Sequence, residues 1–216
     1  MTALLTIACG VVLALVLVGW SMRDVDSSTR VALAAVLGVA ATAFNIVVPI
    51  PSVEMTTTTV LCVAVALGMR MGIATGLVAV IGSSVAGGVG AWTVWQIVGM
   101  AVIASAGAAV GTALRAARGD IRRDGVIDIA MLGCVTALVT LGYDVVVTVP
   151  SALMLAPVSG STPAHQAWTM LLLGAPYTAV HVVACVLLTI TCGPPLLFTL
   201  SRARVRLAAD PAVTAL

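Results

Sequence analysis

Charged side chains are scarce in this 216-residue chain, and lysine is absent altogether. Charged residues make up 8% of the sequence, against roughly 25% in a typical soluble domain, so they are too few to cover a surface that faces water. Without lysine the chain has neither a phosphate-binding Gly-x-x-x-x-Gly-Lys loop nor a lysine Schiff base. The ten basic residues, all arginine, are split among short segments and form no patch for a nucleic acid.

Cysteine spacing that would indicate a metal site or a disulfide framework is also missing. The chain contains no Cys-x-x-Cys pair, and its cysteines all lie in apolar runs, at Cys9, Cys62, Cys134, Cys185 and Cys192. We therefore expect them to be small buried hydrophobic side chains. The sequence indicates no resident metal or cofactor.

Long apolar runs are what the sequence has in abundance, since 61% of its residues are hydrophobic. Runs of about 18 residues or more recur along the chain, and a helix of that length can cross a bilayer. A transmembrane β-barrel would instead show alternating segments of about 10 residues. The sequence thus predicts an all-α, polytopic transmembrane helical bundle. Its expected spans are 3–20, 31–48, 52–69, 71–90, 94–114, 125–149 and 167–192.

Prolines mark several of these expected boundaries. Pro51 suits the first position of the third helix, Pro150 is expected to close the sixth, and Gly193-Pro194-Pro195 to end the seventh. No basic residue precedes the run at 3–20, so we interpret it as a retained membrane helix and not as a signal peptide.

The arginines orient this topology. All ten would fall on one side of the membrane, between the first and second spans, the third and fourth, the fifth and sixth, and after the seventh. Arginine accumulates in cytoplasmic segments. We therefore expect a multi-pass protein of the cell membrane with its N-terminus outside and its C-terminus in the cytoplasm.

Polar side chains within the spans gather in the half that this topology places outside. Such groups are costly in hydrocarbon, so the asymmetry predicts a pocket that receives a polar ligand from outside. Asp144 and His181, ionisable groups within apolar helices, are expected to face that pocket or to pair with each other; the alternative is a hydrogen bond that serves only helix packing. Threonine can instead bond to its own helix, and tryptophan can belong to the interfacial belt. The candidate binding residues are Asn45, Glu54, Thr57, Trp92, Trp95, Gln96, Tyr143, Asp144, Tyr177 and His181.

A stripe of small residues, Ala34, Gly38 and Thr42, recurs at steps of four in the second span. Such stripes allow close contact between helix backbones in lipid. The stripe is interpreted either as packing inside the bundle or as a docking face for another membrane subunit.

Four segments together resemble one protein family. Gly90-Ala91-Trp92-Thr93-Val94-Trp95-Gln96 resembles the "GPWTPWQ" signature of substrate-binding S components of energy-coupling factor transporters. The segments 50–57, 66–72 and 193–197 are similar, in the same order, to the family's "LPNVQPVT", "LALGPRAG" and "GPPLL" stretches. The chain departs from these signatures at Ala91, Val94 and Met69, where the family has proline.

This resemblance implies a six-helix substrate-binding domain at 29–200, preceded by an additional transmembrane helix and loop at 1–28 and followed by a cytoplasmic tail at 201–216. S components are not enzymes. They bind a vitamin, a vitamin precursor or a metal ion from outside and associate with a transmembrane scaffold subunit and two cytoplasmic ATPases. Ala34, Gly38 and Thr42 occupy the place of the motif that docks on the scaffold. Members with the Trp-Gln motif are partly assigned to corrinoid uptake, so cobalamin or a precursor is the leading ligand here.

Two other classes remain open at this stage. Ser83 or Ser84 with His181 would supply the residue types of a rhomboid-type intramembrane serine hydrolase. A stand-alone secondary transporter is the other alternative, although the internal repeats usual in such proteins are not evident. A purely structural membrane subunit would leave the outward clustering of polar groups unexplained.

Overall fold

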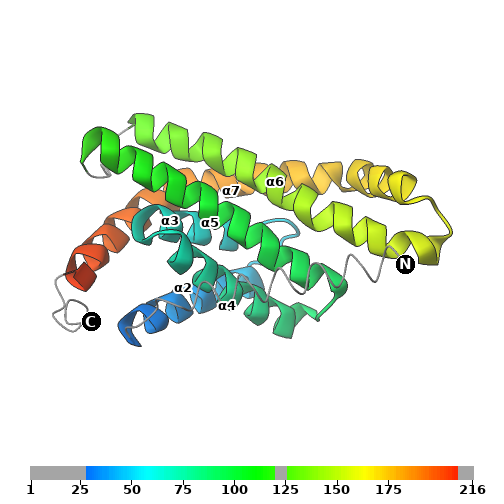
Figure 1. Ribbon diagram of the computed structural model, residues 1–216, viewed down its shortest axis with the longest axis horizontal. Coiled ribbons are helices and arrows are strands. Elements are labelled where there is room, and N and C mark those ends of the chain that lie inside the picture. The colour runs from blue at the N-terminus through cyan, green and yellow to red at the C-terminus, as the bar shows by residue number, and fades with distance from the viewer. Residues whose placement is uncertain (1–27, 120–125, 209–216) are drawn as a thin grey trace.

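The computed structural model describes residues 28–119 and 126–208, and this part of the chain is all-helical, without β-strands. The expected span at 3–20 lies outside the described residues. Figure 1 shows the helices as a bundle in which α6 and α7 form the longest pair. The helices are α2 (Ser28–Val47), α3 (Thr56–Leu67), α4 (Met69–Gly87), α5 (Ala91–Arg118), α6 (Val126–Ser159) and α7 (Pro163–Ala208).

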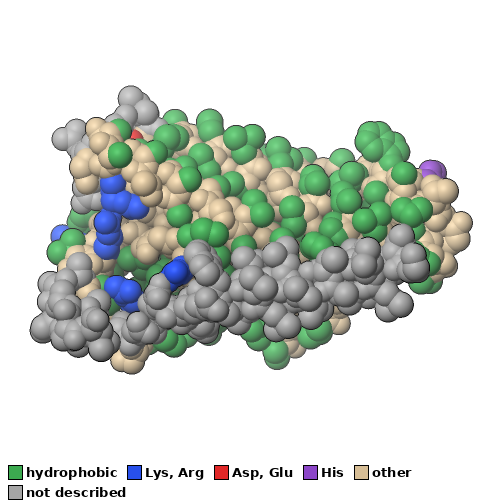
Figure 2. Space-filling view, in the orientation of Figure 1, with side chains coloured by type: hydrophobic (Ala, Val, Ile, Leu, Met, Phe, Trp, Pro, Cys, Tyr) green, Lys and Arg blue, Asp and Glu red, His purple; other side chains and the backbone are tan. Residues whose placement is uncertain are grey.

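Five of these helices, all except α3, are long and apolar enough to cross a membrane. This confirms the all-helical class and agrees with a multi-pass membrane protein. Along the outer face of α7, large apolar side chains such as Leu173 and Val183 are 71% and 58% exposed, as expected of a surface in contact with lipid. Figure 2 shows hydrophobic side chains over much of the long face of the bundle.

Helix α3 is the exception, and the expected span at 52–69 is wrong for the described structure. Its 12 residues rise only about 18 Å, less than the roughly 30 Å of hydrocarbon in a bilayer. The helix starts at Thr56 and not at Pro51 because the preceding segment turns instead: Ser52 has a positive φ of 64°, and the backbone N–H of Val53 donates to the carbonyl of Ile50 at 3.0 Å.

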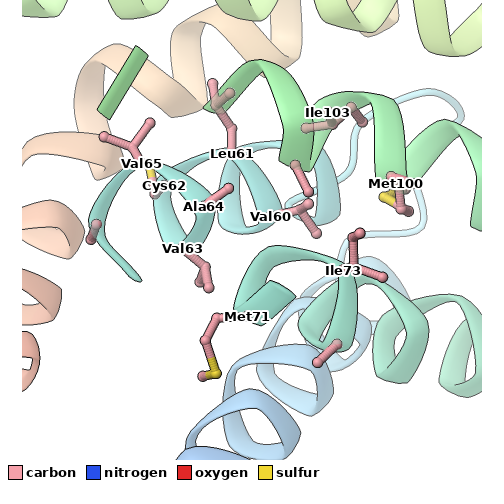
Figure 3. Close-up of a cluster of buried hydrophobic side chains, with 14 of the residues drawn as sticks. Val60, Leu61, Cys62, Val63, Ala64, Val65, Met71, Ile73, Met100 and Ile103 are labelled. Atoms are coloured by element: carbon pink, nitrogen blue, oxygen red, sulfur yellow. The ribbon is translucent and has the colours of Figure 1, made fainter. Parts of the chain in front are cut away.

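This short helix is the centre of the hydrophobic core. Every residue from 56 to 66 is buried, and α4, α5 and α7 pack around it. Figure 3 shows Val60, Leu61 and Val63 of α3 close to side chains of α4 and α5. Glycine allows α5 to approach, since a Cβ at Gly111 would lie 2.1 Å from the carbonyl oxygen of Val65. The backbones of α3 and α5 are therefore nearly in contact.

Prolines do not end the last two helices, contrary to the sequence-based expectation. Helix α6 continues through Pro150, and α7 continues through Pro194 and Pro195 to Ala208, so residues 201–208 extend a helix where a tail was predicted. In a membrane, hydroxyl side chains and neighbouring helices can satisfy backbone groups that a proline leaves unpaired. In Figure 1 the C-terminal part of α7 turns away from α6.

The small-residue stripe of α2 is covered by α4. Ala34, Gly38 and Thr42 are all buried, and a Cβ at Gly38 would lie 2.6 Å from the Cβ of Val78. The hydroxyl of Thr42 donates to the carbonyl of Ala79 at 3.2 Å. This arrangement corresponds to the interpretation as packing inside the bundle, and docking of a scaffold subunit on α2 stays a prediction.

The described arginines gather at one end of the bundle. Arg30 of α2 and Arg204 of α7 line the same small cavity, and Arg115 of α5 donates to the carbonyl of Val65 near the end of α3 at 2.7 Å. Figure 2 shows the basic side chains at that end. We call it the arginine end; which side of the membrane it faces stays a prediction. Of the described cysteines, Cys62 and Cys185 are buried as expected, whereas Cys134 is exposed.

Candidate functional site

A polar cavity of about 360 Å³ lies away from the arginine end. Its walls come from the end of α2, the segment 48–55, the start of α5, the second half of α6 and the first half of α7. The lining residues are Asn45, Ile50, Ser52, Val53, Glu54, Gln96, Tyr143, Asp144, Val147, Thr148 and His181. Three of these are two carboxylic acids and one histidine, and both carboxyl groups lie within hydrogen-bond distance of the imidazole in an otherwise apolar bundle.

His181 bridges two carboxylates. Its Nδ1 lies 2.9 Å from Oδ1 of Asp144 on α6, and its Nε2 lies 3.2 Å from Oε1 of Glu54 in the segment before α3. The imidazole is buried, with 8% of its side chain exposed, whereas the side chains of Glu54 and Asp144 keep 25% and 17%. We call these three residues the acid–histidine triad. Its histidine is enclosed by protein while both acids retain access to the cavity.

Neighbouring side chains fix the triad in place. Thr57, in the first turn of α3, donates its hydroxyl to Oε1 of Glu54 at 3.0 Å. The ring of Tyr143 meets the ring of His181 edge-on, with centroids 5.9 Å apart and planes at 78°, a favourable geometry for two aromatic rings. Cys185, one turn after His181, lies with its Sγ 3.9 Å from the backbone carbonyl of Glu54. The triad therefore joins α6, α7 and the start of α3.

Asn45 holds the segment that carries Glu54. Its Nδ2 donates to the hydroxyl of Thr56 at 2.9 Å, and its Oδ1 accepts the backbone N–H of Met55 at 2.9 Å. One amide at the end of α2 thus satisfies two groups at the start of α3 that have no partner within that helix. Asn45 lines the cavity and also fixes its wall.

The structure brings most of the predicted binding residues together. Six of the ten line the cavity directly, and Thr57 supports Glu54 from behind. The six are Asn45, Glu54, Gln96, Tyr143, Asp144 and His181. The predicted contact between Asp144 and His181 is present, and Glu54 is a second acid on the same histidine.

The remaining three predicted residues lie elsewhere. Trp92 is 49% exposed and Tyr177 is 61% exposed, and neither lines the cavity. The ring of Trp92 folds back onto its own turn, where a Cβ at Gly90 would meet it at 2.2 Å. Trp95 also lies outside the cavity wall, and its Nε1 is buried without a hydrogen-bond partner among the described residues. The position of Trp92 suits the alternative interpretation as an interfacial residue.

Two further polar residues line the cavity, Ser52 and Thr148, and neither was predicted as a binding residue from the sequence. Thr148 follows Asp144 by one helical turn, so helical periodicity could have identified it once Asp144 was placed in the pocket. Ser52 gave no comparable signal, because its place in the wall depends on the turn that its positive φ makes possible.

The geometry of His181 bears on two other chemistries, serine hydrolysis and metal binding. Both of its ring nitrogens face carboxylates, so neither is free to activate Ser83 or Ser84, as a serine hydrolase would require. Within residues 28–119 and 126–208, no group of three His, Cys, Asp or Glu side chains is arranged to hold a metal ion.

Comparisons of the chain with protein-family models, with curated proteins and with solved structures gave no match.

Proposed function

We propose that this protein is a membrane-embedded binding subunit that captures a small polar molecule for import, of the S-component type suggested by its sequence. The observation that carries the proposal is a polar cavity with a buried acid–histidine triad in the wall of an apolar bundle, away from the arginine end. Ionisable groups within membrane helices are expensive and usually functional. If the arginine end faces the cytoplasm, as such ends generally do, the cavity lies toward the outside.

The sequence motif and the cavity support the same assignment. Gln96, the last residue of the segment that resembles the family signature, lines the cavity, and Glu54 comes from a second segment that resembles a family stretch. In an S-component system the scaffold subunit and two ATPases would supply the energy. This division of labour agrees with the absence of any phosphate-binding lysine in this chain.

The size of the cavity favours a ligand smaller than a corrinoid. At about 360 Å³ it lies near the lower end of the roughly 300–1,000 Å³ of pockets for drug-sized ligands. A corrinoid macrocycle with its side chains is far larger than a drug-sized molecule. We therefore propose a compact vitamin-like molecule or precursor and set the corrinoid aside.

Native mass spectrometry of protein purified in mild detergent tests this proposal. A small molecule should remain bound to the wild type and be lost from Gln96→Ala and Asp144→Asn, while both variants stay folded. Gln166→Ala is the matched control, because Gln166 bonds to Ser161 at the opening of α7, outside the cavity wall. Retention of the molecule by both cavity variants would place the binding site elsewhere.

The triad also favours a second candidate, a stand-alone proton-coupled transporter, because chains of Asp, Glu and His within membranes serve as proton relays. The two candidates differ in what drives transport. Vesicles that contain the purified chain alone should bind the released molecule without accumulating it under a pH gradient. Accumulation without ATPase partners would establish the transporter and refute the S-component assignment.

A further inference from the structure

The charge of the cavity follows from the hydrogen bonds of the triad. An ionised carboxylate only accepts hydrogen bonds, so an imidazole placed between two ionised carboxylates must donate from both nitrogens and carry a positive charge. The distances of 2.9 Å and 3.2 Å are hydrogen-bond distances at both nitrogens. Two ionised carboxylates and one imidazolium leave one net negative charge.

Moving one proton from His181 to either acid gives the same total. If His181 is neutral, one of its nitrogens has no hydrogen, and the acid that faces it must be protonated to donate there. One ionised carboxylate then remains, and the net charge is again one negative unit. The hydroxyl of Thr57 donates to the same Glu54 oxygen that faces His181, so this oxygen acts as an acceptor. In both arrangements, therefore, the triad is one positive charge short of neutrality.

The described protein does not supply that positive charge near the cavity. No arginine lines the cavity, and Arg30, Arg115 and Arg204 lie at the arginine end. An uncompensated charge in a membrane interior is unfavourable. Glu54 and Asp144 each bond to His181 through one oxygen, and their second oxygens accept no hydrogen bond from the described residues. These oxygens are available to a ligand at the partly exposed carboxylates.

We infer that the cavity takes a small organic molecule with a single positive charge, such as a protonated amine or an N-alkylated heteroaromatic ring. This inference rests on the proposed function and names its ligand class. The cation would approach the second oxygens of Glu54 and Asp144, and Gln96 and Thr148 would offer hydrogen bonds to its uncharged part. A divalent cation carries more positive charge than the single negative charge of the triad can balance, and an anion would add to that negative charge.

Three probes that share a pyridine ring and differ in charge test the inference: 1-methylnicotinamide, which is a cation, nicotinamide, which is neutral, and nicotinate, which is an anion. Each is titrated against the purified full-length chain in detergent, and its Kd is obtained from the rise in melting temperature with probe concentration. The cation should bind with a Kd at least about tenfold lower than that of nicotinamide, a difference of about 1.4 kcal/mol. Nicotinate should give no rise.

Two variants then assign the preference to the triad. Glu54→Gln removes the excess charge while keeping the side-chain shape, so the cation and nicotinamide should bind about equally; Asp144→Asn is the second variant if the first does not fold. Asp128→Asn is the matched control, because Asp128 is a buried acid near the other end of α6. That control should keep the preference for the cation.

Three outcomes would overturn the inference: equal or tighter binding of nicotinamide or nicotinate, no rise with any probe, or an unchanged preference in a folded triad variant. The measurement uses the isolated protein, so it is independent of transport. A preference for the cation with no ligand-dependent import would remove the S-component proposal and keep the charge assignment. Import of a neutral or anionic compound would keep the S-component proposal and remove the charge assignment.

Discussion

Replacing His181 by phenylalanine isolates the electrostatic contribution of the triad. Phenylalanine keeps a ring in the cavity wall, so the edge-on contact with Tyr143 at 5.9 Å can be retained. The substitution removes the donor between Oε1 of Glu54 and Oδ1 of Asp144, which lie 3.2 Å and 2.9 Å from the two ring nitrogens. Two carboxylates then face each other across an apolar ring.

The expected loss of stability follows from burial. Removing one partner of a buried ion pair costs about 3–5 kcal/mol. The side chains of Glu54 and Asp144 keep 25% and 17% exposure, so water in the cavity solvates part of their charge. We therefore expect a loss of about 2–3 kcal/mol, a large share of the roughly 5–15 kcal/mol that stabilises a typical folded protein.

Reversible unfolding in mixed detergent micelles measures this loss. The triple variant His181→Phe, Glu54→Gln, Asp144→Asn should recover more than half of it, because neutral amides carry no charge to be left unpaired. His165→Phe is the control, since the other histidine of the chain is exposed at the start of α7, and it should change stability by less than about 0.5 kcal/mol. The electrostatic explanation fails if His181→Phe is as harmless as this control, or if the triple variant is no more stable than the single one.

Three further predictions concern packing and hydrogen bonds. Gly111→Ala should lower the unfolding free energy by about 1–3 kcal/mol, because its Cβ would meet the Val65 carbonyl at 2.1 Å. Gly142→Ala is the control and should be neutral or stabilising, because a Cβ there has nothing within 4 Å. Equal effects of the two substitutions would contradict the close α3–α5 contact. Asn45→Ala frees the start of α3 from α2 and should raise the Kd of the best-binding pyridine probe several-fold in the melting assay; an unchanged Kd would refute this role. Thr189→Val removes the hydroxyl shared by Thr58 and Thr136, which keep their backbone acceptors, and should cost about 0.5–1.5 kcal/mol in the same unfolding assay; a variant as stable as the wild type would show that the shared hydroxyl contributes nothing.

Position along the membrane axis was predictable from sequence, and this is why much of the cavity wall was anticipated. The lengths of the apolar runs and the positions of the arginines give each polar residue an approximate depth. Asp144 and His181 were both placed in the outward half and expected to share the pocket or to pair, and the structure joins them at 2.9 Å. Glu54 was placed toward the same side because it lies at the start of the third expected span.

Rotation about the helix axis was not predictable in the same way. In a soluble helix the apolar stripe marks the buried face, but in lipid both the outer face and the packed face are apolar. Tyr177 precedes His181 by one turn, yet it is 61% exposed and surrounded in sequence by lipid-type residues such as Leu173. The expectation that Pro150 ends a helix failed for a related reason. Proline ends helices in soluble proteins, where water can bond to the carbonyl that proline leaves unpaired. In a bilayer, ending the helix would leave more backbone groups without partners than continuing it does.

The shortness of α3 accounts for the cavity itself. With about 18 Å of helix in about 30 Å of hydrocarbon, roughly 12 Å of depth must be occupied by the segment 48–55, whose backbone is not helical. Non-helical backbone at membrane depth is tolerated where it lines a polar cavity or is enclosed by protein. Here Asn45 satisfies the N–H of Met55, and Ile50, Ser52, Val53 and Glu54 of the same segment line the cavity. The polar opening is thus a consequence of ending α3 early, and the same opening provides the space in which a ligand can reach the triad.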